Sequence, residues 1–207
     1  MAARVYFVLD KSGSMAAHAD DTIGGMNAFI REQSDNTVLS LNTFNDKVTT
    51  VYADVSKSAV TPLTNMLYRP MGGTALLDAI GYTIRMATNI EPTSWADQDD
   101  DSTVTIVMLT DGNENSSKEY THAHIRDLVE LKRLQGWRFV FLGANQDAFL
   151  TAKDIGIDPA STLNFDTGVV DTAIRSAGSA VARMTSGTSN SISFTDLERT
   201  ASQPMSF

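Results

Sequence analysis

Two short apolar runs, VYFVL at residues 5–9 and VTIVML at residues 104–109, restrict the fold most strongly. Each run is apolar at nearly every position, which is typical of a β-strand that is covered on both faces. A third run at residues 137–142 has the same character. Strands of this kind occur in sheets that carry helices on both sides, so the three runs predict an α/β fold.

Segments with helical spacing alternate with these runs. The clearest is at residues 76–90, where Leu76, Leu77, Ile80 and Ile84 begin an apolar stripe along one helix face. The alternation predicts a doubly wound, Rossmann-like, mostly parallel sheet with helices on both faces. We expect helices at residues 20–30, 76–90, 121–134, 147–154 and 169–184, and strands at residues 5–9, 38–44, 47–52, 104–109, 137–142 and 161–165.

The organisation along the chain predicts one domain, residues 1–185, and a flexible C-terminal tail, residues 186–207. The tail is rich in Ser, Thr, Gly and Asn and has few apolar residues. Arg4 is the only basic residue before the first apolar run, which is too short for the hydrophobic region of a signal peptide. No stretch reaches the roughly 20 apolar residues of a spanning helix. We therefore expect a cytoplasmic protein.

Polar residues follow two of the apolar runs where each run ends. Asp10, Ser12 and Ser14 supply oxygen atoms at alternate positions after the first run, and Asp111 follows the second. Thr74 stands at the start of the helix predicted at residues 76–90. Parallel strands bring their carboxyl ends to one edge of the sheet, where ligands bind. The five residues are therefore a candidate site for a hard cation, which prefers oxygen ligands.

The segments DKSGS at 10–14, GGT at 72–74 and LTDG at 109–112 resemble the metal-ion-dependent adhesion site of von Willebrand factor A (vWA) domains. The resemblance covers about residues 4–185 and is to a compact, stand-alone bacterial or phage type. It implies that the hydroxyls of Ser12 and Ser14 bind the cation directly and that Thr74 binds it directly or through water. Asp10 and Asp111 would mainly hold coordinated waters. It also implies one short antiparallel edge strand, for which residues 47–52 are the candidate.

The resemblance implies a function as a metal-dependent protein-binding module rather than an enzyme. Mg²⁺ is the expected cation, with Mn²⁺ and Ca²⁺ as alternatives, and it keeps a coordination position for an Asp or Glu of a partner protein. The formal net charge of −9 disfavours nucleic acid and anionic membranes as partners. A bound cation sets the local field, so an acidic chain can still recognise an acidic side chain.

Two other classes of function stay open from the sequence. A Mg²⁺-dependent hydrolase or phosphoryl-transfer enzyme is one, although the Gly72-Gly73-Thr74 segment lacks the lysine of a phosphate-binding loop. Ser12 also stands where such enzymes carry a second aspartate. The other class is a structural component of a larger assembly, such as a phage particle, in which the metal serves only stability.

Two further candidate metal sites are rejected. The acidic run at residues 97–101 has the spacing of an EF-hand loop, but Ser102 and Met108 stand where glycine and glutamate are needed. His122 and His124 are two residues apart and face different ways on a helix, so they make a poor zinc pair.

Overall fold

The computed structural model describes residues 3–89, 103–144 and 148–203. Its elements follow the predicted alternation of strand and helix. They are β1 (Ala3–Asp10), α1 (Ala19–Glu32), β2 (Thr37–Phe44), β3 (Val48–Ser56), α2 (Leu76–Asn89), β4 (Thr103–Thr110), α3 (His122–Leu134), β5 (Arg138–Ala144), α4 (Ala148–Asp154), β6 (Thr162–Phe165), α5 (Val170–Thr185) and α6 (Asp196–Ala201).

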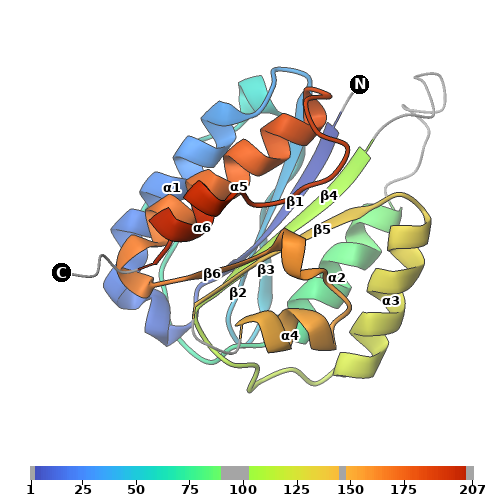
Figure 1. Cartoon of the computed structure of the whole chain (residues 1–207). Helices are drawn as coiled ribbons and strands as arrows, with labels where there is room; N and C mark the ends of the chain where they lie inside the picture. The colour runs from blue at the N-terminus through green and yellow to red at the C-terminus, as the bar shows by residue number, and fades with distance from the viewer. Residues whose placement is uncertain (1–2, 90–102, 145–147, 204–207) are drawn as a thin grey trace.

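Within the described residues, six strands form one sheet in the order β3-β2-β1-β4-β5-β6. All neighbours are parallel except β2 and β3. Helices α1, α5 and α6 lie on one face and α2, α3 and α4 on the other (Figure 1). The predicted doubly wound, mostly parallel fold is therefore confirmed. The strand order reverses at β1, which pairs with both β2 and β4, so the carboxyl ends of β1 and β4 border the crevice where such sheets bind ligands.

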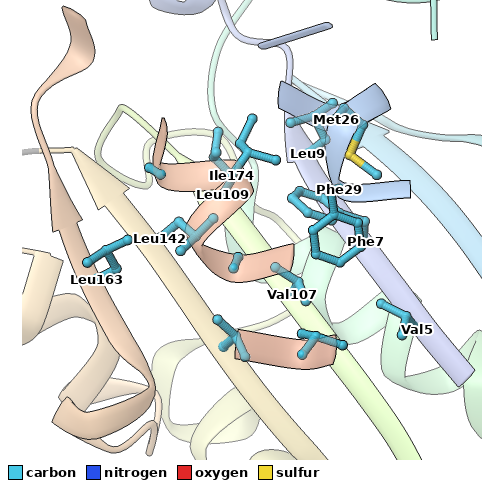
Figure 2. Packing of buried hydrophobic residues seen from close by; sticks show 14 of the residues in the cluster. Val5, Phe7, Leu9, Met26, Phe29, Val107, Leu109, Leu142, Leu163 and Ile174 are labelled. Carbon is cyan, nitrogen blue, oxygen red and sulfur yellow. The ribbon is translucent and has the colours of Figure 1, made fainter. Parts of the chain in front are cut away.

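The central strands are mostly apolar because they separate two cores. Side chains of β1 alternate between the two faces, with Val5, Phe7 and Leu9 in the core under α1 and α5, and Tyr6 and Val8 in the core under α2 and α3. Figure 2 shows the first core, where Phe7 packs edge-on against Phe29 of α1 with ring centroids 5.2 Å apart. Burial on both faces fixes the register of β1 against its neighbours. The register in turn fixes where Asp10, the last residue of β1, lies along the edge of the sheet.

The antiparallel edge strand is present but is longer than predicted. β3 runs from Val48 to Ser56 and pairs with β2 through an irregular register. Asp54 adopts a positive φ of 48°, and its amide donates a hydrogen bond of 2.9 Å to the Ser40 hydroxyl. The extra residues extend the hairpin at the end remote from the Asn45-Asp46 turn.

The C-terminal segment differs from the flexible tail that we predicted. Residues 188–203 pack against the domain, with Ile192 and Phe194 buried in the core under α1 and α5. α6 begins with a capping box, in which Thr195 and Glu198 exchange hydrogen bonds between side chain and backbone. The packed domain therefore extends at least to Gln203.

Some predictions fall on residues that the structure does not describe. The acidic run at 97–101 is among them. In the part of the chain that is described, no helix is long and apolar enough to cross a membrane.

Candidate metal centre

The Asp10 carboxylate links the ends of β1 and β4. Register places Leu9 opposite Leu109, so the next residues, Asp10 and Thr110, are neighbours. The Thr110 hydroxyl donates a hydrogen bond of 2.6 Å to Asp10 Oδ2, and the Ser12 amide donates one of 2.6 Å to Asp10 Oδ1. The Tyr68 hydroxyl donates to the Asp10 carbonyl at 2.6 Å. Asp10 is fully buried, and these contacts fix its orientation.

The next turn places three oxygen atoms in a row. Ser12 Oγ lies 3.1 Å from Ser14 Oγ, and Ser14 Oγ donates to Asp111 Oδ1 at 2.6 Å. Oxygens that share Mg²⁺ at roughly 2.1 Å and at right angles lie roughly 3 Å apart. The separation of the Ser12 and Ser14 hydroxyls is close to that value. Ser12 is buried, Asp111 is half-buried and Ser14 is exposed, so Ser14 is the member of the row that is most open to solvent.

Thr74 reaches the same site from the start of α2. The preceding Gly72 has a φ of 82°, which favours glycine, and its carbonyl accepts a hydrogen bond of 3.0 Å from the amide of Gly13. Thr74 is 3% exposed. A Cβ atom added to Gly112 would lie 3.3 Å from Thr74 Oγ1 and 3.8 Å from Ser14 Oγ. The absence of a side chain at residue 112 therefore keeps a space open between these two hydroxyls.

The donor set suits a hard divalent cation. In the described part of the chain, no group of three or more His, Cys, Asp or Glu side chains could hold a metal, so this site differs from a carboxylate or histidine cluster. Its oxygens come from two serines and one threonine, with two carboxylates beside them. Burial raises the pKa of Asp10 to about 6, against the hydrogen bonds from Thr110 and Ser12, which lower it. A cation nearby would favour the ionised carboxylate.

All five residues predicted for the site thus lie at one edge of the sheet, contributed by three separate loops. The structure adds contacts that the sequence did not indicate. Asp46 Oδ2 accepts a hydrogen bond of 3.1 Å from the Gly73 amide, and Asn115 Oδ1 accepts one of 2.9 Å from the Thr74 amide. These pairs are 27 and 41 residues apart, so no local spacing could reveal them. For Thr110, the sequence offered one indication of a role at the site, namely its position beside Asp111 at the end of a buried strand.

Comparison with known families finds a match over most of the chain. The family model described as von Willebrand factor type A domain matches residues 5–177. No curated protein is detectably similar to the sequence.

Several solved structures share the fold. Proximal thread matrix protein 1 from the mussel byssus, with a zinc-occupied MIDAS motif, is 18% identical with a TM-score of 0.54, over 83% of this chain and 46% of that one. The manganese-loaded TRAP protein of Plasmodium vivax is 18% identical with a TM-score of 0.57, over 82% and 71%. A von Willebrand factor type A protein from Catenulispora acidiphila is 16% identical with a TM-score of 0.59, over 86% and 42%. The chain thus spans less than half the length of the first and third.

Proposed function

Because this chain belongs to the von Willebrand factor type A domain family, we propose that it is a divalent-cation-dependent protein-binding module. The hydroxyls of Ser12, Ser14 and Thr74 would hold the cation, and Asp10 and Asp111 would hold waters bound to it. The cation, when bound, supplies a Lewis-acidic position that a carboxylate from a partner can occupy. The observation that carries the proposal is the row of Ser12, Ser14 and Asp111 oxygens at 3.1 and 2.6 Å.

Mg²⁺ is the cation that we propose. Neutral hydroxyls and water-bridged carboxylates are hard oxygen donors, which suit Mg²⁺ and Mn²⁺. The structural neighbours from Plasmodium vivax and the mussel byssus contain manganese and zinc, respectively. Those ions support a divalent cation at this kind of site, and the hydroxyl-rich donor set of the present chain favours Mg²⁺ over zinc.

The surface around the site suits a protein partner. Met71 is 64% exposed. It lies beside the turn that carries Ser12, because its amide donates a hydrogen bond of 2.8 Å to the Lys11 carbonyl. Met66 is 80% exposed five residues earlier in the same loop. Exposed methionines adapt to partners of different shape. A partner that places an Asp or Glu on the cation would also contact the surface formed by these methionines.

A binding role also fits the environment of the serines better than catalysis does. Phosphoryl transfer uses a lysine or arginine to neutralise charge on the transferred group. In the described residues, Ser12 Oγ and Ser14 Oγ form hydrogen bonds with each other and with the carboxylates of Asp10 and Asp111. We therefore propose that the module is not an enzyme.

The test compares Ser12→Ala/Ser14→Ala with Ser56→Ala/Ser58→Ala. The second pair is a matched control, since these two serines are also two residues apart with their hydroxyls 3.4 Å apart. Ser56 ends β3, and Ser58 lies in the short helical turn that follows. Calorimetric titration with Mg²⁺ and Mn²⁺ measures metal affinity, and capture from a host extract with Mg²⁺ or chelator measures partner binding.

We expect the first double variant to lose both metal and chelator-sensitive partners, and the control to keep both. A first double variant that keeps metal binding contradicts the site. One that loses metal but keeps every partner contradicts the binding role and favours a structural use of the metal.

A further inference from the structure

One asparagine joins the two loops that carry Thr74 and Asp111. Asn115 Oδ1 accepts a hydrogen bond of 2.9 Å from the Thr74 amide, and the Asn115 amide donates one of 3.0 Å to the Thr74 carbonyl. Asn115 therefore holds the backbone of Thr74 on both sides. It follows Asp111 by only four residues, so it links the two proposed metal loops over a short path.

Two carboxylates connect the loop that follows Asp111 to the start of α2. The Glu114 carboxylate accepts hydrogen bonds from the Leu77 amide at 2.9 Å and from the amides of Ser116 and Ser117 at 2.9 and 2.7 Å. In the other direction, the Asp78 carboxylate accepts from three loop amides at 2.8 to 2.9 Å, those of Lys118, Glu119 and Tyr120. Glu114 also places negative charge at the start of α2, where the helix dipole favours it. Residues 114–120 and the first turn of α2 thus form one connected unit.

We infer that Asn115 is a positioning residue for the metal centre, which fixes the Thr74 hydroxyl relative to Asp111. This inference rests on the proposed metal site. Mg²⁺ demands ligand distances of about 2.0–2.1 Å in near-octahedral geometry, so small displacements of a ligand loop weaken binding. The space at issue is narrow, because a Cβ atom at residue 112 would already lie 3.3 Å from Thr74 Oγ1.

The environment of Asn115 separates this role from general stability. Its side chain is exposed, so removing it opens no cavity in the core. Its Oδ1 also accepts a hydrogen bond of 2.6 Å from the neighbouring Ser116 hydroxyl. Losing exposed hydrogen bonds of this kind lowers the stability of the fold only modestly. Residues that orient metal ligands, in contrast, typically change metal affinity by roughly 10- to 100-fold.

The experiment measures Mn²⁺ affinity by calorimetry and melting temperature without metal for three single variants of the full chain. Asn115→Ala removes the acceptor. Asn115→Asp keeps an acceptor oxygen for the Thr74 amide and is the conservative rescue. Asn113→Ala alters an exposed side chain of the same loop, two residues away, and is the matched control.

We expect Asn115→Ala to bind Mn²⁺ at least about tenfold more weakly than wild type. Its metal-free melting temperature should stay within a few degrees of wild type. Asn115→Asp and Asn113→Ala should both retain wild-type affinity or better.

Three results overturn the inference: a smaller loss in Asn115→Ala, an equal loss in Asn113→Ala, or a large fall in the metal-free melting temperature of Asn115→Ala. Ser12→Ala/Ser14→Ala, titrated in parallel, separates the two proposals. If it loses Mn²⁺ while Asn115→Ala keeps it, only the role of Asn115 fails. If wild type does not bind Mn²⁺, both fail.

Discussion

The Arg183 guanidinium donates two hydrogen bonds to the Glu198 carboxylate, from Nη1 to Oε1 at 2.7 Å and from Nη2 to Oε2 at 2.9 Å. Nη2 also donates to the Ser193 carbonyl at 3.0 Å. This two-pronged pair connects α5 to α6 and holds the segment between them. Such geometry makes an arginine–carboxylate pair stronger than an ordinary surface ion pair.

The pair predicts a pH dependence of stability. Burial alone would raise the pKa of Glu198, but the hydrogen bonds from Arg183 and Thr195 outweigh it and hold the pKa below the ordinary value. A lowered pKa in the folded state stabilises the fold above the unfolded-state pKa, and this contribution disappears as the pH falls through the folded-state pKa.

We expect Glu198→Gln to lower the free energy of unfolding by roughly 1–2 kcal/mol at pH 7, and by less at pH 3, because the contribution of the ionised carboxylate falls as the pH drops towards its folded-state pKa. Chemical denaturation at both values measures it. Glu130→Gln, at an exposed position on α3, is the control and should differ little from wild type at either pH. A Glu198→Gln deficit that is undiminished at pH 3 would contradict the role of the ion pair.

Metal binding predicts a shift in melting temperature. A ligand that binds only the folded state at 100 times its dissociation constant stabilises it by about 2.7 kcal/mol. For a domain of this size that corresponds to a rise of roughly 5–10 °C. We expect Mg²⁺ to produce this rise in wild type and in Ser56→Ala/Ser58→Ala, and chelator to reverse it. Ser12→Ala/Ser14→Ala should show no shift, and a shift of wild-type size there would place the cation elsewhere.

Gly112→Ala is expected to weaken metal binding without unfolding the domain. Its Cβ would enter the space beside the hydroxyls of Thr74 and Ser14, at 3.3 and 3.8 Å. Calorimetry should give at least a tenfold loss of Mg²⁺ affinity, in the range roughly seen when metal surroundings are disturbed. Gly24→Ala in α1 is the control, because the single close neighbour of its added Cβ is Asp171 Oδ1 at 3.6 Å. Unchanged affinity in Gly112→Ala would mean that the ion does not use this space.

Two threonines of β4 give a paired prediction. Thr110 donates to the buried Asp10 carboxylate, so Thr110→Val should destabilise the fold by roughly 1–3 kcal/mol. Thr105 is buried on the same strand, but among the described residues its hydroxyl has no hydrogen-bond partner. Thr105→Val should therefore be neutral or stabilising. Denaturant titration measures the free energy of unfolding of both variants. Equal losses of stability would show that the hydrogen bond from Thr110 to Asp10 does not stabilise the fold.

The local pattern of apolar and polar residues was sufficient to predict the fold and to predict that the candidate site residues lie together. Continuous apolar runs identified β1 and β4 as strands covered on both faces, and their carboxyl ends brought Asp10 and Asp111 together. Thr74 followed from its place at a helix start. Cation binding by these residues stays a prediction.

The remaining features depend on contacts between distant residues. Ile192 and Phe194 are isolated apolar residues in a polar segment, so periodicity could not mark them as buried. The pairing of Arg183 with Glu198 has no helical or strand spacing across its 15 residues. Asn115 resembles any polar loop residue until the fold places it against Thr74.

The C-terminal segment also has a consequence for aggregation. Open sheet edges recruit strands from other molecules through unpaired backbone groups. The Arg199 guanidinium donates hydrogen bonds of 2.8 to 3.0 Å to the carbonyls of Pro159, Ala160 and Thr162, at and just before the start of β6. A second molecule would have to displace this arginine to add a strand there. We therefore expect loss of residues 188–203 to expose both the β6 edge and the part of the core that Ile192 and Phe194 cover, and so to favour association between molecules.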